Sequence, residues 1–536
     1  MKNYGYLTKK IGTLKSSKLF LMQTYKDCYN YTMPLRGVGY TNYGSQQSQD
    51  SNVSTANIYK ANKYDATATD ACKQLASFII SNISPSNLRW FDFDIAQDPT
   101  IRLDWLDKTA DLIWREIHAG NYNSSAYECI LDLIIGGQGI LFQDMKNHQL
   151  HFELWDTSSC YFECTVKGGQ VDCVYREYSL TKQQALIEFE GEDIPDAIRT
   201  AGDDTNIEFI HAIFPREKGE YGGMKELKPF ASIHLLAKGG VCVRESGYDE
   251  FPLAIPRWVV IPNSPYAFGP VYEALDDIKT LNQTTKFILQ NAEMAICGMY
   301  GAVDDGVLNT GSIQVGPRKV IIMAERDNMW SIPSTGDFRI SETMQESQRQ
   351  QVRRSMMVDQ LTMPYQQGTT ATEINTRTEL LRQVTGPVFG RLEEFLQSVI
   401  FRAFGLLLRD EKLPPLPEEL KDLPQLSIRY VNPLARAQRN IEVQTIQNFE
   451  MSLAQTAQVD PSILDVYKWD EGARAKANLM GIPEILMTTD KEFAEIQKQK
   501  AESAKQQHDQ ALQDEIAVKS AGKAQAGKPV EQGVMQ

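Results

Sequence analysis

One very long amphipathic helix constrains this chain of 536 residues more than any other feature of its sequence. Apolar residues recur at steps of three and four between residues 371 and 409, which keeps one face of a single helix buried throughout. At about 1.5 Å per residue, such a helix is about 58 Å long. Thr370 and Glu373 form a capping box at its start, and Gly386-Pro387 predicts a kink within it. The apolar positions are Leu381, Val384, Val388, Leu392, Phe395, Val399, Ala403 and Leu406.

The bulk composition limits the class of protein. The composition, with 42% hydrophobic and 23% charged residues, is typical of a globular protein. The length of the chain requires several modules. The formal charge of −14 argues against tight nucleic-acid binding through bulk charge, although local basic residues could still face a nucleic acid. No apolar run reaches ~18 residues, and the N-terminus lacks the apolar core of a signal peptide, so we expect no membrane contact.

The eight cysteines are spread thinly, which favours reduced thiols in a cytoplasm. Cys160, Cys164 and Cys173, with His151, were the best candidates for a zinc site. They lack a C-x2-C pair and fall in predicted strands, so we predict no metal and no cofactor.

Two segments have the spacing of nucleotide-binding motifs but lack the residues or elements that such motifs require. The segment GKAQAGK at residues 522–528 has P-loop spacing, but Pro529 stands where Ser or Thr should ligate magnesium, and no strand precedes it. The GGQG segment at 136–139 follows a helix rather than a strand, unlike a dinucleotide fingerprint. We therefore predict that the chain is not an enzyme.

The periodicity along the chain predicts an α+β, mainly helical protein. Seven short strands lie between residues 139 and 261, with one helix near 181–191 among them. The segment 298–336 is turn-rich and lies between two helices, the second of which is polar nearly all round. Helices are expected at 12–30, 61–83, 103–121, 124–136, 271–295, 337–360, 371–409, 435–456, 460–467 and 471–480.

Four segments then carry a resemblance to a known family. They are YTMP at 31–34, ISPSNLRWFDFDI at 83–95, GPVYEALDDIKTLN at 269–282 and TTATEI at 369–374. In order and spacing they resemble the portal, or head-to-tail connector, proteins of short-tailed bacteriophages, over about residues 15–480. The resemblance implies a subunit with wing, stem, clip and crown that forms a ring of twelve subunits.

The resemblance also implies a division of the chain. Residues 1–270 would form the wing, 271–297 and 337–361 the two stem helices, and 298–336 the clip. Residues 362–371 would be the tunnel loop, 372–410 the long wing helix, 411–489 the helical wing and crown, and 490–536 a polar, partly disordered tail.

The resemblance places two sets of residues at a DNA channel. The candidates for facing DNA are Lys279, Lys286, Arg349, Arg353 and Arg354, although each could instead form an intersubunit salt bridge or lie on a solvated face. The tunnel loop would comprise Met363, Pro364, Tyr365, Gln366, Gln367, Gly368, Thr369 and Thr370.

The implied function is that of a ring at one capsid vertex, which conducts double-stranded DNA without sequence specificity during packaging and ejection. The implied partners are the major capsid and scaffold proteins, the terminase motor and a tail adaptor protein. Assembly would occur in the host cytoplasm, and the final location would be the virion. The alternative is a virion scaffold or adaptor protein without a DNA channel.

Overall fold

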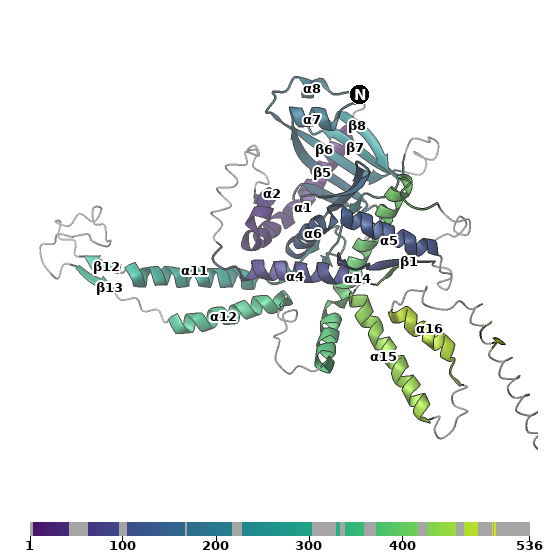
Figure 1. Cartoon of the computed structure of the whole chain (residues 1–536). Coiled ribbons are helices and arrows are strands. Elements are labelled where there is room, and N and C mark those ends of the chain that lie inside the picture. The colour runs from purple at the N-terminus through teal and green to yellow at the C-terminus, as the bar shows by residue number, and fades with distance from the viewer. Residues whose placement is uncertain are drawn as a thin grey trace, which may run out of the picture. The chain divides into compact units, whose positions relative to one another are not determined.

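The structure is a computed structural model that divides into two compact units, Met1–Leu434 and Ala435–Gln536 (Figure 1). It describes residues 4–41, 63–95, 104–166, 169–216, 228–297, 299–302, 329–332, 338–358, 371–415, 426–431, 433–456, 466–480, 496 and 498–499. Within these residues, no helix combines the length and apolar character needed to cross a bilayer.

The first unit opens with helices that precede its sheets. The long α1 (Gly5–Thr32) leads through η1 (Pro34–Gly37) into α2 (Val38–Thr41). Three further helices follow: α4 (Thr67–Ile83), α5 (Asp104–Ala119) and α6 (Tyr122–Gly136). Between α4 and α5, β1 (Phe91–Ile95) pairs antiparallel with β14 (Leu426–Tyr430), which joins segments far apart in the sequence.

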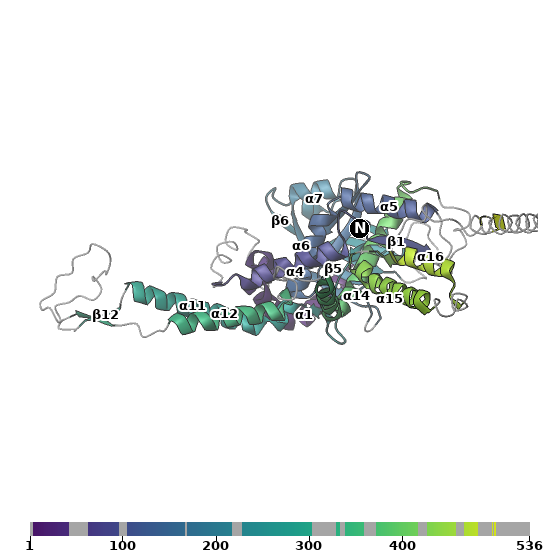
Figure 2. The same ribbon diagram turned by 60° about the horizontal axis from the view of Figure 1, so that its bottom comes forward.

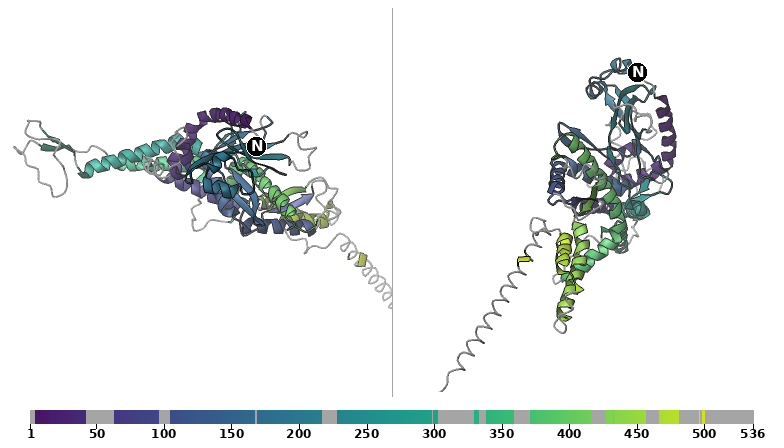
Figure 3. Two further views of the ribbon diagram at one scale, coloured as in Figure 1. Left: turned by 90° about the horizontal axis from the view of Figure 1, so that it is seen from above. Right: turned by 90° about the vertical axis from the view of Figure 1, so that its right-hand side faces the viewer.

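A five-stranded antiparallel sheet forms the next part of this unit, in the order β4-β5-β6-β7-β8. The N-terminal half of α1 lies along one face of the sheet, where Leu7 and Ile11 pack with Tyr161 and Tyr175 (Figure 3). The short helices α7 (Lys182–Glu188) and α8 (Asp196–Arg199) pack against Phe209 through a separate apolar cluster. The strands are β4 (Cys160–Glu163), β5 (Cys173–Thr181), β6 (Asn206–Pro215), β7 (Phe230–Leu236) and β8 (Cys242–Tyr248).

A smaller sheet, in the order β3-β2-β9, connects the five-stranded sheet to the helices. Its strands are β2 (Leu141–Lys146), β3 (Gln149–Leu154) and β9 (Leu253–Ala254). The helix α14 (Ala371–Arg409) packs beside β2, β9 and α5. The largest apolar core lies here, and Trp90, Trp155 and Phe152 are among its fully buried side chains.

The two helices expected to form a stem lie side by side in antiparallel directions (Figures 1 and 2). After the short pair β10 (Val259–Val260) and β11 (Ala267–Phe268), a single turn α10 (Pro270–Glu273) leads into α11 (Leu275–Cys297). Its partner is α12 (Phe338–Ser355). Between them, β12 (Met299–Ala302) pairs antiparallel with β13 (Met329–Ile332).

The sequence predictions agree with most of these elements. The α+β class is confirmed, all seven strands predicted between 139 and 261 are present, and α14 has the predicted bounds. Leu392, Phe395 and Val399 on its predicted apolar face are buried. Helix α14 is continuous across Gly386-Pro387, and a bend of its axis there stays a prediction.

Some predicted helices differ in their bounds from the structure. The helix expected at 61–83, for example, begins at Thr67 in α4. The second stem helix was expected to reach residue 361, but α12 ends at Ser355 because Met357 adopts a left-handed φ of 59°. The first helix was expected to start at residue 12, but it starts at Gly5.

Two described helices make up most of the described part of the second unit: α16 (Trp469–Met480) and α15 (Pro433–Thr456), whose first two residues belong to the first unit. The ring of Tyr467 packs edge-on against Phe449, and its hydroxyl donates a hydrogen bond to Glu450. Lys476 forms an ion pair with the same glutamate, which links α16 to α15.

Candidate functional site

The predicted site begins with α11 and α12, whose side chains hold the two helices in a fixed register. Gln345 on α12 donates a hydrogen bond to the hydroxyl of Thr285 on α11, at 2.9 Å. Thr285 is buried and lies on the same face of α11 as Ile278 and Leu281. The pair is therefore positioned by a specific polar contact together with apolar packing.

Lys279 is held by a carboxylate of the same chain. Its ammonium lies 2.6 Å from a carboxylate oxygen of Asp27 on α1. Burial alone would lower the pKa of Lys279, but the hydrogen bond from Lys279 to Asp27 and the attraction between their charges outweigh it and raise that pKa. The contact joins α11 to α1, so this candidate DNA-facing residue is half of an ion pair within the subunit.

Arg349 is held in a similar way by the residues just before α4. Two nitrogens of its guanidinium donate to one carboxylate oxygen of Asp65, at 3.1 and 3.0 Å. Burial alone would raise the pKa of Asp65, but hydrogen bonds from Thr67 and Arg349 hold it below its usual value. This ion pair ties α12 to the start of α4.

The two residues before Asp65 also contact other helices. The backbone N–H of Tyr64 donates to the side chain of Asn282 on α11, at 2.6 Å. Lys63 donates to the carbonyl oxygen of Thr32 at the end of α1, at 2.8 Å. We call residues 63–65 the stem anchor, because three consecutive residues contact α1, α11 and α12.

The remaining candidate cations are more accessible. The ammonium of Lys286 lies 5.9 Å from the centre of the Tyr64 ring, a cation–π contact. Arg353 is 3.7 Å from the carboxylate of Glu346, two turns earlier on α12. Arg354 is exposed and has no ion-pair partner within the part of the chain that the structure describes.

The predicted tunnel loop, residues 363–370, lies outside the described residues, and so does Thr370 of the predicted capping box. The side chain of Glu373 also lies outside the described part of the structure, so the capping box stays a prediction. The structure does place the start of α14 at Ala371, directly after this loop.

The opposite end of α14 is clamped by a carboxylate that the sequence analysis did not identify. Arg402 donates to Glu250 at 2.7 Å, and Arg409 donates to both oxygens of the same carboxylate, at 2.6 and 2.7 Å. Gly405 lies between the arginines on this face, where a Cβ atom would come within 2.5 Å of the Glu250 carboxylate. The glycine therefore allows the carboxylate to approach the helix. We call Glu250, Arg402 and Arg409 the α14 clamp.

A second unpredicted contact fixes α1 to the five-stranded sheet. The ammonium of Lys18 is fully buried and donates to the carbonyl oxygens of Thr157, Ser158 and Cys160, at 2.6, 3.0 and 2.8 Å. Burial lowers the pKa of Lys18 to about 8. The three hydrogen bonds occupy all three N–H donors of the ammonium, so Lys18 joins α1 to the start of β4.

The residues considered for zinc do not form a metal site. Within the described residues, no cluster of three or more His, Cys, Asp or Glu side chains could hold a metal ion. Burial raises the pKa of the thiols of Cys160 and Cys173 to about 12 each, so both are protonated at neutral pH.

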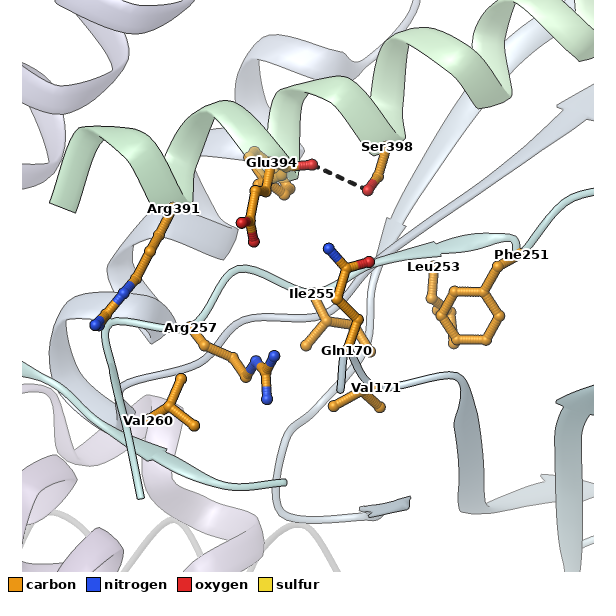
Figure 4. Close-up of a pocket in the computed structure, with 11 residues that line it drawn as sticks. Gln170, Val171, Phe251, Leu253, Ile255, Arg257, Val260, Arg391, Glu394 and Ser398 are labelled. Carbon is orange, nitrogen blue, oxygen red and sulfur yellow. Dashed lines mark hydrogen bonds between the residues drawn. The ribbon is translucent and has the colours of Figure 1, made fainter. Parts of the chain in front are cut away.

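Two adjoining hollows lie between α14, α1 and the connections of the sheets. The smaller, of about 180 Å³, is shown in Figure 4, and the larger is about 790 Å³. Both are lined by Arg257 and Val260. Neither lining includes a histidine, and the charged groups of the smaller are Arg257, Arg391 and Glu394.

Taken together, these features define an α+β protein in which long helices are tied to one another and to antiparallel sheets by side-chain contacts. The sequence of residues 6–487 matches the model of a family described as "Bacteriophage head to tail connecting protein". The chain belongs to this family, as the resemblance of its motifs predicted.

Individual relatives agree with this assignment. The chain is 24% identical over 526 residues to the portal protein of Salmonella phage epsilon15, a match that covers 93% of this chain and 91% of that protein. It is 23% identical over 546 residues to the probable portal protein of Bordetella phage BPP-1, covering 94% and 92%.

Among solved structures, a chain of "Virion of native gene transfer agent (GTA) particle" aligns with 64% of this chain and 80% of its own length. The TM-score is 0.32 and the sequence identity is 10%, a likeness too low to support an argument.

Proposed function

We propose that the chain is a phage portal protein, which forms a ring at one capsid vertex and provides the channel for DNA packaging and ejection. The observation that carries this proposal is the family match across residues 6–487, together with two portal relatives that align over more than nine-tenths of the chain. These findings do not favour the alternative of a scaffold or adaptor protein without a channel. The function is structural and requires no catalytic step from this chain.

The parts of the chain then take the roles that the family resemblance implies. Helices α11 and α12 form the stem, the residues between them form the clip, and the sheets with α1, α4, α5 and α6 belong to the wing. The tunnel loop at 363–370 comes between α12 and α14. The contacts from the stem anchor support this division, because they join both stem helices to α1 and α4.

The charges of the stem suit sliding rather than tight binding. Lys279, Arg349 and Arg353 each lie beside a carboxylate, so they would reach a channel as halves of ion pairs. Among the described residues, the Tyr64 ring is the only partner of the Lys286 ammonium, and we propose Lys286 as the strongest DNA contact of the five candidates. The net charge of −14 per subunit would repel phosphates at close range and keep sliding friction low. We propose that the DNA contact is made to the backbone and is therefore sequence-independent.

The partners follow from this role. They are double-stranded DNA, the major capsid and scaffold proteins, the terminase motor during filling and a tail adaptor protein afterwards. Assembly would take place in the host cytoplasm, and the mature location would be the portal vertex of the virion.

Electron microscopy of the purified protein tests the proposal. We expect top views of a ring of about twelve subunits, with a central hole wide enough for a duplex of ~20 Å. A monomer, or an irregular oligomer at every salt concentration, would contradict the portal function and favour an adaptor. The variant Lys286→Glu should keep the ring and reduce the amount of DNA packaged, whereas Lys286→Arg should preserve packaging.

A further inference from the structure

Each stem helix has an exposed stripe on the side away from its partner. On α11 the stripe follows a spacing of four and three residues, and every member is exposed: Asp276, Thr280, Gln283, Phe287 and Gln290. On α12 the corresponding stripe is Met344, Ser347, Gln351 and Arg354, again all exposed. Phe287 is 57% exposed and Met344 is 53% exposed, so each stripe carries one large apolar side chain among polar ones.

The two stripes match in height along the helix pair. The contact between Thr285 and Gln345 fixes the antiparallel register. Asp276 lies nine residues before Thr285, and Arg354 lies nine residues after Gln345, so the two charges are level. Phe287 and Met344 lie close to the same contact and are level with each other. At about 1.5 Å per residue, Asp276 and Phe287 are about 16 Å apart along α11, and Arg354 and Met344 about 15 Å apart along α12.

The stripes also match in chemistry. Asp276 is an exposed anion and Arg354 an exposed cation, and neither has an ion-pair partner in the described ranges of the chain. Phe287 and Met344 are apolar and flexible enough to pack together, and sulfur–aromatic contacts are favourable. At one end of the stripes, the charge of Asp276 is opposite to that of Arg354. At the other end, Phe287 and Met344 are both apolar.

We infer that the α11 stripe of one subunit packs against the α12 stripe of the next subunit, with Asp276 paired to Arg354 and Phe287 in contact with Met344. The inference rests on the proposed ring. With the helix pair running along the ring axis, rotation about that axis leaves the height of every residue unchanged, so groups that are level within one subunit are also level between neighbours. The contact is head-to-tail, because two different surfaces of the same chain meet.

The assignment gives Arg354 a role different from that of Lys286. Its charge is used between subunits at the base of the stem, close to the stem anchor. The ion pair selects the register of neighbouring stems, because a slip by one turn would place Arg354 beside Thr280 and leave both charges unpaired.

Charge reversal tests the ion pair. In Asp276→Lys and in Arg354→Glu, like charges meet at every interface of the ring, so the subunit concentration for half-assembly should rise about tenfold or more. The double variant D276K/R354E restores opposite charges and should assemble within about threefold of the wild type. Native mass spectrometry measures the assembly, and circular dichroism checks that each variant is folded.

The outcomes separate this inference from the proposed function. A wild type without rings would contradict the portal proposal itself. Rings in the wild type and equally in both single variants would overturn the Asp276–Arg354 pairing, and so would single variants that lose the ring while the double variant fails to recover it.

Cross-linking tests the apolar end independently. In the variant F287C/M344C, mild oxidation should join neighbouring subunits into a ladder of covalent multimers on a non-reducing gel, because the two positions would be within disulfide distance. The matched control is L289C/M344C: Leu289 is also exposed, at 51%, but lies about 200° around α11 from Phe287. A ladder from the control and none from F287C/M344C would overturn the assignment of the stripes.

Discussion

Replacing Glu250 by alanine should loosen the C-terminal end of α14, because one carboxylate holds two arginines of that helix. The two contacts differ in burial. The Arg402 side chain is 5% exposed and that of Arg409 is 38% exposed. Without Glu250, the nearest carboxylate to Arg402 would be Asp144, at 3.9 Å. The buried guanidinium would then be poorly paired.

The magnitude follows from this difference. Breaking a buried ion pair by removing one partner costs about 3–5 kcal/mol, whereas an exposed pair contributes about 0–1 kcal/mol. Since Glu250 is itself 37% exposed, solvent screening reduces the first figure, and we expect about 2–3 kcal/mol for Glu250→Ala. Arg409→Met should cost at most about 1 kcal/mol.

Hydrogen–deuterium exchange of the amides in residues 400–409 measures this local stability in the assembled protein. A loss of about 2–3 kcal/mol corresponds to exchange roughly 30–150-fold faster, and a loss of about 1 kcal/mol to roughly fivefold. The double variant E250L/R402M removes the buried guanidinium of Arg402 together with its partner, and Arg409 keeps a contact to Asp249 at 3.6 Å, so it should exchange more slowly than Glu250→Ala. Equal acceleration in Glu250→Ala and Arg409→Met would refute the argument that burial of Arg402 determines the strength of the α14 clamp.

Three further predictions concern other contacts. Gly137→Ala should prevent folding of the first unit, because Gly137 has a φ of 84° and a Cβ atom there would lie 2.3 Å from the backbone of Phe268. The yield of soluble protein on expression measures the loss of folding. Lys18→Met should lower the free energy of unfolding by about 2–4 kcal/mol, because three buried carbonyl groups lose their donor, and an unchanged melting temperature would contradict this. The ionised Asp65 should stabilise the fold fully at any pH above the pKa that Asp65 has in the unfolded chain. This stabilisation should be lost as the pH falls through the lower pKa of Asp65 in the native protein. The difference in melting temperature between wild type and Arg349→Met should therefore shrink in acid.

Local sequence patterns predicted the elements that depend on local contacts. The apolar spacing of α14 and the alternation of the seven strands were sufficient, because helix and strand periodicities are set by neighbouring residues. The start of α1 was missed because Leu7 and Ile11 are buried against Tyr161 and Tyr175, residues that a local pattern does not connect to them.

The candidate site was predictable as a set of cations but not as a set of contacts. The partners of Lys279 and Arg349 lie 252 and 284 residues away, so no spacing in the sequence could indicate them. The α14 clamp has one feature that is visible in the local sequence, a glycine between two arginines within a helix. This feature indicates a clamp only together with Glu250, which is 152 residues before Arg402.

The stem anchor has a mechanical consequence. Lys63, Tyr64 and Asp65 are consecutive, so the bonds they make to α1, α11 and α12 originate from one short piece of backbone. Any tilt of the helix pair against α4 would strain these bonds together, because three successive residues cannot move independently. Part of a load applied along the helix pair would therefore pass to α1 and α4 through this short segment, next to the Lys279–Asp27 contact that also joins α11 to α1.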